Sequence, residues 1–440
     1  MSSQLAKDVT IRALLIGFAL MLTLCATAWA ASEKVLYAFH GKDGNGPNSV
    51  IIGSDGSLYG TTGLGGSCDS RGCGVVFQLT RDAKGRWHET VLHDFAGTDG
   101  EFPSDSLVAD KLGNLYGTTV YGGPLDQCSN GGCGVVFELT PGADGKWTYK
   151  VVHEFGVTDG AAPYGGLIFD SQGNLYGTTS HGGNTSACAG GCGVAFKLSP
   201  DGKGNWTEMV LYSFDGTDGE APAAPLTFDS AGNLYGTTQH GGAHGSGTVF
   251  KLSLGKNGQW TSKTLHSFTS STKDGYEPTY GVIFDSLGNL YSTTPFGGTV
   301  GGQGWGTAFR LTPTKSDKWN ETILRVFDRA KFGGGYVSSG LVLDQQGNLY
   351  GTANWGGGYK CPSGGGLGCG VVFKLTPHAN GKWTEVVVHS FGRGKDGVFP
   401  GGSLVFDASG PLFGTTAEGG YQGGLCGIGG GCGIVYELTP

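Results

Sequence analysis

Seven loop positions are candidates for ligand binding because their residues change while the sequence around them repeats. Each lies two residues after a Thr-Thr or Thr-Ala pair and directly before Gly-Gly; in chain order they are Leu64, Tyr121, His181, His240, Phe296, Trp355 and Glu418. A purely structural position would be expected to repeat like its neighbours. Aromatic rings offer flat apolar faces on which sugars or planar ligands stack. We therefore predict that Tyr121, His181, His240, Phe296, Trp305, Trp355 and Glu418 bind a ligand; the alternative is that they only cover the mouth of a central channel.

Three histidines in the same loops could serve as general bases or metal ligands. They are His181, His240 and His244, the last two within the segment HGGAH. Neutral imidazoles suit both roles, but the sequence places no carboxylate beside them. The sequence thus favours a protein that is not an enzyme. Four other histidines share a different slot, two residues before a repeated Phe, and are interpreted as structural: His93, His153, His266 and His389.

Ten cysteines lie in pairs within single loops of the same kind. The pairs are Cys68/Cys73, Cys128/Cys133, Cys188/Cys192, Cys361/Cys369 and Cys426/Cys432. In an exported protein such spacing predicts five local disulfides, and metal binding through the thiolates is the competing interpretation. Such small rings add only about 2 kcal/mol each through chain entropy, so we expect them mainly to stiffen glycine-rich loops.

A second type of loop carries the pattern Asp-Gly-x-x-Pro or a close variant. Its aspartates are Asp43, Asp99, Asp159, Asp218, Asp274 and Asp396. Asp before Gly forms turns through side-chain bonds to its own backbone, whereas a calcium cage needs several carboxylates in one loop. We interpret these residues as turn formers, and the sequence predicts neither a metal site nor a cofactor.

Both types of loop belong to a repeat that runs through the chain. The segments SLYGTT, NLYGTT, NLYSTT, NLYGTA and PLFGTT mark seven copies, beginning at Ser57, Asn114, Asn174, Asn233, Asn289, Asn348 and Pro411. Each copy carries four short apolar runs bounded by Gly, Asn or Asp, which are strand and hairpin signals. Four antiparallel strands per repeat predict an all-β, seven-bladed β-propeller. We name its strands A to D from the centre outward.

The two ends of the sequence complement each other. The last residues, GIVYELTP, form a strand C without a following strand D, and residues 34–39, KVLYAF, form a strand D without a preceding blade. Phe39 matches the Phe that ends every other strand D. We therefore expect residues 31–39 to complete the last blade and close the ring, which removes the exposed edges of an open array.

The repeat resembles the choice-of-anchor GloVer tandem-repeat family of bacterial exported proteins. The resemblance rests on GNLYGTT, the following GG and the strand GVVFKLT, and it covers the chain after its first thirty residues. The Asp-x-x-Gly-Asn-Leu-Tyr core is also similar, more distantly, to NHL-type propeller repeats. The family resemblance implies export and transfers no catalytic residues.

The first thirty residues have the composition of a signal peptide. Lys7 and Arg12 precede an apolar run from Ala13 to Cys25, and Ala28-Trp29-Ala30 follows as a small-x-small cleavage site. We expect residues 1–30 to be removed and residues 31–440 to form one domain. The product would be periplasmic, extracellular or on the cell surface, with no membrane span after cleavage.

Charge and composition limit the partners. The formal net charge of −8 argues against nucleic acid, which needs clustered Lys and Arg. We predict a monomeric binding module for a glycan or cell-envelope component, on the face that bears the B-to-C and D-to-A loops. The alternatives are an extracellular hydrolase or lyase with a loop histidine as base, and a purely structural surface protein.

Overall fold

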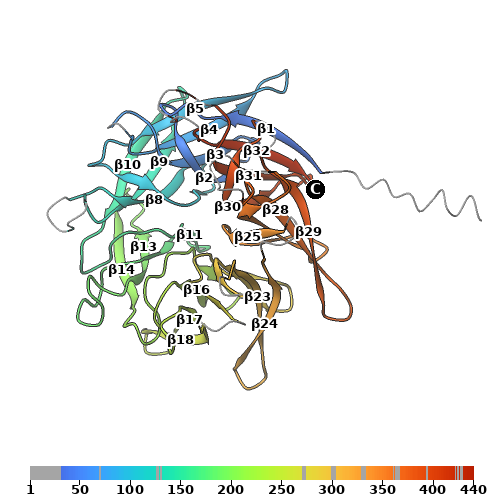
Figure 1. Cartoon of the computed structure of the whole chain (residues 1–440). Coiled ribbons are helices and arrows are strands. Elements are labelled where there is room, and N and C mark those ends of the chain that lie inside the picture. Colours follow the sequence, from blue (N-terminus) through green and yellow to red (C-terminus); the bar gives the residue numbers. More distant parts are fainter. Residues whose placement is uncertain are drawn as a thin grey trace, which may run out of the picture.

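The protein is a ring of seven small antiparallel sheets, the blades of a β-propeller, each with four strands (Figure 1). The structure is a computed structural model that describes residues 31–68, 71–124, 128, 131–269, 274–298, 304–328, 333–359, 361, 367–392, 395–421, 423, 426 and 430–440. The predicted all-β fold and the number of blades are confirmed. The predicted signal peptide, residues 1–30, lies outside the described residues.

The first four blades follow one another along the chain. Blade 1 is β2 (Asn45–Ile52), β3 (Leu58–Leu64), β4 (Val75–Arg81) and β5 (Trp87–Asp94). Blade 2 is β6 (Glu101–Pro103) with β7 (Val108–Ala109), then β8 (Leu115–Tyr121), β9 (Val135–Pro141) and β10 (Trp147–Glu154). Blade 3 is β11 (Ile168–Phe169), β12 (Leu175–Thr179), β13 (Val194–Pro200) and β14 (Trp206–Ser213). Blade 4 is β15 (Thr227–Phe228), β16 (Leu234–Thr238), β17 (Thr248–Leu254) and β18 (Trp260–Ser267).

The remaining three blades complete the circle. Blade 5 is β20 (Ile283–Phe284), β21 (Leu290–Thr294), β23 (Thr307–Pro313) and β24 (Trp319–Val326), beside the small pair β19 (Gly275–Tyr276) and β22 (Phe296–Gly297). Blade 6 is β25 (Gly334–Val337) with β26 (Val342–Leu343), then β27 (Leu349–Gly356), β28 (Val371–Pro377) and β29 (Trp383–Ser390). Blade 7 is β30 (Val398–Phe406), β31 (Leu412–Glu418), β32 (Ile434–Thr439) and β1 (Ser32–Ala38). Among the described residues no helix is long and apolar enough to cross a membrane.

The N-terminal strand closes the ring as the sequence predicts. Strand β1 pairs antiparallel with β32, from Ser32 opposite Thr439 to Ala38 opposite Ile434. In Figure 1 the blue β1 lies beside the red β32, so the two ends of the domain share one sheet. Strand β32 therefore has partners on both sides and leaves no edge inside blade 7.

The core is built at the junctions between blades. The Phe that ends each strand D is buried and packs, in an edge-to-face or tilted geometry, on the aromatic residue of strand C in the next blade. The centroid distances are 4.8 to 5.3 Å for Phe39–Phe77, Phe95–Phe137, Phe155–Phe196, Phe214–Phe250, Phe268–Phe309, Phe327–Phe373 and Phe391–Tyr436. Such pairs add about 0.5–1.5 kcal/mol each beyond the area they bury.

The same aromatic residues explain the Gly of LYGTT. Gly177 of β12 lies opposite Phe196 of β13, and a Cβ on Gly177 would come within 2.6 Å of the Phe196 ring. Blade 5 has Ser292 at this position, whose hydroxyl donates to the carbonyls of Tyr280 and Gly281. The small residue is thus required by the close approach of a ring rather than by a turn.

A β-bulge in each outer strand turns one side chain toward the next blade. In β10 the register against β9 shifts between Val151 and His153, and the other outer strands shift at the same place. The residue after the bulge is His, Tyr or Arg, and six of the seven contact the aspartate of the following Asp-Gly loop. Arg325 instead pairs with Glu385 of blade 6, at 2.6 Å. We call these contacts the outer rungs.

The outer rungs also account for the Asp-Gly loops. Asp99 accepts from the backbone amide of Ala96 at 2.8 Å and contacts His93 at 3.0 Å. Asp159 does the same with Gly156 and His153. Burial alone would raise the pKa of Asp99 and Asp159. The contacts with the histidine and the backbone amide stabilise the charged carboxylate more strongly, so the pKa of both aspartates lies below its usual range. The interpretation of these aspartates as turn formers agrees with the structure.

Glutamates from the next outer strand, among them Glu89 and Glu208, approach outer rungs and lose much of their hydration there. Burial, together with the negative charge of Asp43 beside Glu89 and of Asp159 beside Glu208, raises the pKa of both glutamates to about 7. One carboxylate oxygen of each is buried without a hydrogen-bond partner among the described residues. Between pH 4.5 and 7 the folded protein therefore keeps protons that the unfolded chain has released, so each glutamate lowers stability as the pH rises through that range.

We expect Glu89→Gln to remove one such penalty. At pH 8 the neutral amide should make the protein about 1 kcal/mol more stable than wild type, after allowance for solvent screening, and at pH 4.5 the two should be equal. Urea unfolding at both pH values measures the difference. Glu154→Gln changes an exposed carboxylate of β10 and serves as the control. A gain for Glu89→Gln that is the same at both pH values would contradict the buried charge.

Candidate functional site at the channel mouth

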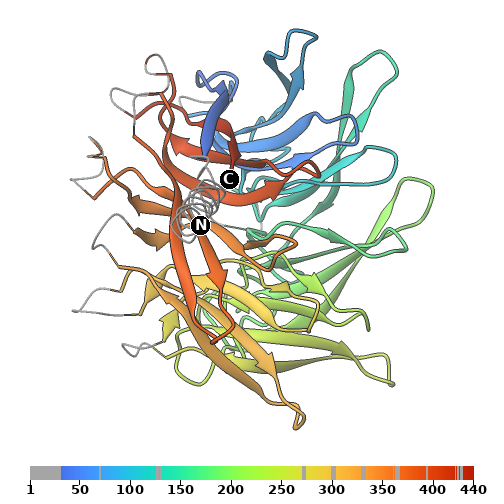
Figure 2. The ribbon, with the colours of Figure 1, turned by 90° about the vertical axis from the view of Figure 1, so that its right-hand side faces the viewer.

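The B-to-C and D-to-A loops lie side by side on one face of the ring. Short bridges join them: Ala161 pairs with His181 in blade 3, and Glu220 pairs with His240 in blade 4. Figure 2 shows that the strands run between two faces, so the connections gather at the two ends of each blade. The predicted loop positions therefore share a face with the Asp-Gly loops, as strand order requires.

One backbone hydrogen bond fastens each B-to-C loop to the next blade. The carbonyl of the residue two positions before strand C accepts from the amide of the residue before the repeated Pro of the next blade, or before Val337 in blade 6, at 2.8 to 3.0 Å. The acceptor/donor pairs are Cys73/Phe102, Cys133/Ala162, Cys192/Ala221, Ser246/Glu277, Trp305/Tyr336, Cys369/Phe399 and Cys432/Gly46. We call these bonds the loop latches. The six donors other than Gly46 have φ between 55° and 60°, a left-handed conformation that costs a non-glycine residue about 1 kcal/mol.

The predicted disulfides belong to these latches. All five pairs are formed: Cys68–Cys73, Cys128–Cys133, Cys188–Cys192, Cys361–Cys369 and Cys426–Cys432. The second cysteine of each pair is buried, and its carbonyl is the latch acceptor. The disulfide thus fixes the loop at the residue that holds the neighbouring blade. Blades 4 and 5 have Ser246 and Trp305 in this place.

The repeated threonines form a platform under the variable positions. The second hydroxyl of the Thr-Thr pair donates to the carbonyl of the variable residue two positions later, for example from Thr179 to His181 at 2.8 Å. The same bond recurs beneath Leu64, Tyr121, His240, Phe296 and Glu418, at 2.7 to 3.0 Å. The backbone of the variable residue is therefore held identically in six blades while its side chain differs.

The seven loop residues predicted to bind a ligand are called the rim residues: Tyr121, His181, His240, Phe296, Trp305, Trp355 and Glu418. Two of them, Phe296 and Trp355, lie against aromatic residues of the D-to-A loops or of the start of strand A. Tyr276 stacks on Phe296 with centroids 5.3 Å apart, and Tyr336 meets the same ring edge-on at 5.3 Å. Trp355 meets Phe399 at 4.8 Å. These rings are half-buried, and the aromatic partners from the D-to-A loops were not predicted from the sequence.

The other predicted rim residues have separate surroundings. Tyr121 has its ring centroid 6.4 Å from that of Phe102, and Trp305 packs against Gly335 in blade 6. Glu418 is half-buried. His181 is exposed and lies 3.0 Å from the hydroxyl of Ser180, measured from Nδ1.

The three loop histidines are all exposed, and the structure does not gather them. Within the described part of the chain, one group of three His, Cys, Asp or Glu residues has its ligating atoms within 4.8 Å of one another, and it contains none of His181, His240 and His244. The three histidines therefore do not bring their ring nitrogens together as ligands of one metal ion.

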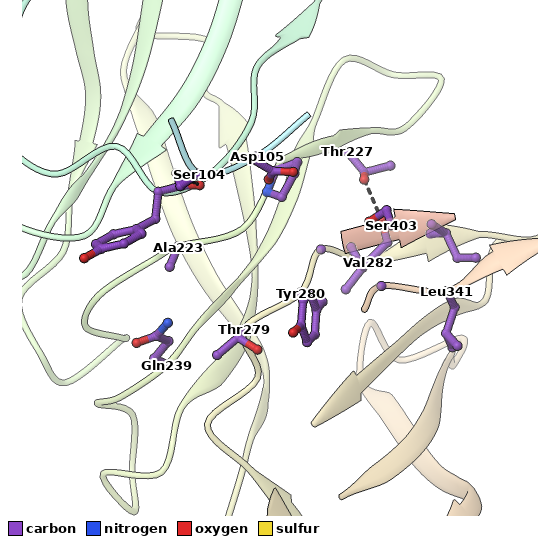
Figure 3. Close-up of a pocket in the computed structure, with 15 residues that line it drawn as sticks. Ser104, Asp105, Ala223, Thr227, Gln239, Thr279, Tyr280, Val282, Leu341 and Ser403 are labelled. Atoms are coloured by element: carbon purple, nitrogen blue, oxygen red, sulfur yellow. Dashed lines mark hydrogen bonds between the residues drawn. The ribbon is translucent and has the colours of Figure 1, made fainter. Parts of the chain in front are cut away.

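A cavity of about 320 Å³ opens at the channel, inside the ring of loop positions. Six blades line it, with Asp105, Tyr164, Gln239, Thr279, Tyr280 and Ser403 among the lining residues. Figure 3 shows Asp105, Gln239 and the consecutive residues Thr279 and Tyr280 around this hollow, from three different segments of the chain. None of the seven predicted rim residues lines the cavity, although Gln239 is the neighbour of His240.

Asp105 is the one acidic or basic residue among those that line the cavity. Its two carboxylate oxygens accept from the backbone amides of Ser106 at 2.6 Å and Gly166 at 2.9 Å. Burial nevertheless raises the pKa of Asp105 above its ordinary value. Its carbonyl is held by Thr61 of blade 1 at 3.1 Å, so both ends of the residue are fixed.

Two tyrosines give the cavity its aromatic surface. Burial raises the pKa of Tyr280 well above its usual range, and burial together with the neighbouring Tyr121 hydroxyl raises the pKa of Tyr164 to about 12. Both phenols therefore remain neutral donors at physiological pH. Tyr121 is the rim residue that reaches the cavity wall through this contact.

Sequence reasoning missed the cavity residues although they carry a readable signal. One position varies as freely as the loop positions do: the one directly after the repeated Pro, which is replaced by Val337 in blade 6. In chain order its residues are Asn48, Ser104, Tyr164, Ala223, Thr279, Ser338 and Gly401. The next position holds Asp105 and Tyr280.

Comparison with known proteins agrees with the repeat and the fold. The sequence profile of the Gloeobacter/Verrucomicrobia repeat family matches residues 23–132 and 125–362. No curated protein sequence matches the chain.

Solved structures of similar shape include a catalytically inactive variant of virginiamycin B lyase from Staphylococcus aureus with quinupristin. It has a TM-score of 0.51 and 14% identity, with 93% of this chain and 99% of that chain covered. A protein of unknown function from Dyadobacter fermentans has a TM-score of 0.43 and 12% identity over 93% of this chain and 98% of that chain. At 14% identity the likeness to the lyase shows the fold alone.

Removal of one platform hydroxyl should loosen the site and the fold together. Thr179→Val keeps the shape of a buried side chain but removes one of the two donors to the His181 carbonyl, the other being the Ala161 amide. It also removes the hydroxyl that accepts from the Val194 amide, so we expect a loss of about 1–3 kcal/mol in urea unfolding. Thr207→Val, on the exposed surface of β14, is the matched control and should change stability little. Equal effects of the two substitutions would show that the hydroxyl does not hold the loop.

Proposed function

This chain belongs to the Gloeobacter/Verrucomicrobia repeat family, and we propose that it is an exported propeller that binds a glycan or related cell-envelope ligand at the channel mouth. The observation that carries the proposal is the cavity of about 320 Å³ with Asp105 in its wall. This volume is at the lower end of small-ligand pockets, which suits one or two sugar rings at the end of a longer chain.

The chemistry of the cavity supports a sugar. Sugar hydroxyls both donate and accept, and Asp105 and Gln239 offer an acceptor pair and an amide, while Thr279 offers a hydroxyl. The rings of Tyr164 and Tyr280 offer faces for the apolar side of a pyranose. Because Asp105 is already oriented by two backbone amides, little side-chain entropy is lost when it accepts from a ligand.

The rim extends this surface outward. Phe296, Trp305 and Trp355 lie on the same face as the cavity, in loops held by latches, and the threonine platform also supports the loop of Phe296 and Trp305. His181, His240 and Glu418 add polar groups at the equivalent places of other blades. In this proposal the cavity holds the end of the glycan and the rim contacts the residues that follow.

Export is supported by the cysteines as well as by the leader sequence. Disulfides form and persist in oxidising compartments, and all five occur in loops of one face. A periplasmic, extracellular or cell-surface location fits a ligand from the cell envelope, and we propose that the exported protein acts as a monomer. The hydrolase or lyase alternative has less support, because the loop histidines do not come together.

Glycan-array binding followed by calorimetric titration of the best ligand tests the proposal. We expect Asp105→Asn and Gln239→Ala each to weaken binding at least tenfold, because each removes a polar contact in the cavity, and Trp355→Ala to weaken the binding of longer glycans more than that of short ones. Unfolding curves of each variant separate loss of binding from loss of fold.

Leu287→Ala is the matched control, since Leu287 is 82% exposed in an A-to-B turn at the other end of blade 5. It should bind like wild type. The absence of glycan binding by the wild-type chain, or equal affinity of Asp105→Asn and wild type, would overturn the proposal and favour a purely structural role.

A further inference from the structure

The outer rung between blades 4 and 5 differs from the other rungs. His266 of β18, Asp274 of the following loop and Glu321 of β24 place one ligating atom each within 4.8 Å of one another, and no other three described His, Cys, Asp or Glu residues do so. Nε2 of His266 lies 3.5 Å from Oδ2 of Asp274 and 3.6 Å from Oε1 of Glu321. All three side chains are largely buried.

A comparison with the rung between blades 2 and 3 isolates the difference. His153, Asp159 and Glu208 occupy the same three places, and there the histidine is within hydrogen-bonding distance of the aspartate, at 3.1 Å. His266 instead lies nearly midway between two carboxylates, too far from either for a hydrogen bond. Its buried Nε2 and Oε1 of Glu321 have no hydrogen-bond partner among the described residues.

The separations fit a metal ion better than they fit a hydrogen bond. Zn²⁺ binds imidazole nitrogen and carboxylate oxygen at about 2.0–2.2 Å, and two ligands at a tetrahedral angle are then about 3.3–3.6 Å apart. Oxygen-rich cages of six to eight ligands, which calcium prefers, are not offered here. The carboxylate of Asp274 is oriented by the amides of Thr269 and Gly275, at 2.9 and 2.8 Å, in the manner of an outer-shell support.

The position of the cluster in the ring gives a reason for such a site. Blades 4 and 5 are the two without a cysteine pair in their B-to-C loops. His266 and Asp274 belong to the end of blade 4 and the segment after it, whereas Glu321 belongs to the outer strand of blade 5. An ion held by all three would join the two blades where no disulfide supports the loops.

We propose that His266, Asp274 and Glu321 bind one divalent transition-metal ion, best matched by Zn²⁺, that fastens blade 4 to blade 5. A fourth coordination position is left for water. This assigns His266 a role beyond the structural one predicted from its place in the repeat.

Titration of the metal-stripped full chain with ZnCl₂ tests the proposal. Calorimetry should show one tight equivalent, and Co²⁺ in its place should give the visible absorption of a four-coordinate ion. His266→Ala and Glu321→Gln should each weaken the tight equivalent at least 100-fold. His153→Ala and Glu208→Gln, the same changes at the rung between blades 2 and 3, should leave it intact.

The stoichiometry and the Co²⁺ spectrum report on the site even where a variant is less stable. His240→Ala with His244→Ala tests whether exposed histidines account for binding, and it should not change the tight equivalent. Loss of the tight equivalent in that double variant, its persistence in both His266→Ala and Glu321→Gln, or its absence from the wild-type chain would each overturn the proposal.

Discussion

The structure depends on the packing of one phenylalanine from each outer strand against an aromatic residue of the next blade. A propeller blade is a small twisted sheet with too little apolar surface to be stable alone, so nearly all of its core must lie between blades. Seven aromatic contacts with centroids 4.8 to 5.3 Å apart set nearly the same spacing at every junction. Equal spacing is what allows the seventh junction to close on the first through β1.

Several repeated residues follow from this packing. The ring of the strand-C aromatic lies over strand B, which explains why LYGTT has Gly at its centre in six blades and a small Ser in the other. The two threonines that follow this Gly in LYGTT form different hydrogen bonds. The first reaches the neighbouring blade at the channel, as Thr61 reaches the carbonyl of Asp105, and the second holds the loop above its own blade. One motif thus positions both the cavity wall and the rim.

The sequence predicts the scaffold much better than the site. Strand number, blade number, closure by residues 31–39 and the five disulfides could all be predicted, because each leaves a repeated local pattern and a ring of equal units has few alternatives. The cavity could not be predicted, because Asp105, Tyr164 and Tyr280 come from three blades and meet only in space. The rim aromatics were identified, but their partners Tyr276, Tyr336 and Phe399 were missed. Tyr336 and Phe399 have a left-handed backbone, and Phe399 also precedes a proline, which local preferences do not lead one to expect.

The degree of repetition changes along the radius of each blade, and this change indicates where chemistry can be placed. In the middle of each blade the aromatic pair and the Gly of LYGTT do not tolerate larger side chains, because any added volume would alter the spacing between blades. At the channel and at the outer strand the constraint is only a hydrogen bond with a backbone group or to a carboxylate, and different side chains can form it. Tyr37, His153 and Arg325 all serve at the same outer place, and Ser104, Tyr164 and Ala223 at the same inner one. A ring fold of this kind can therefore acquire a ligand cavity at its axis and an ion site at its outer strands without disturbing the aromatic packing between blades.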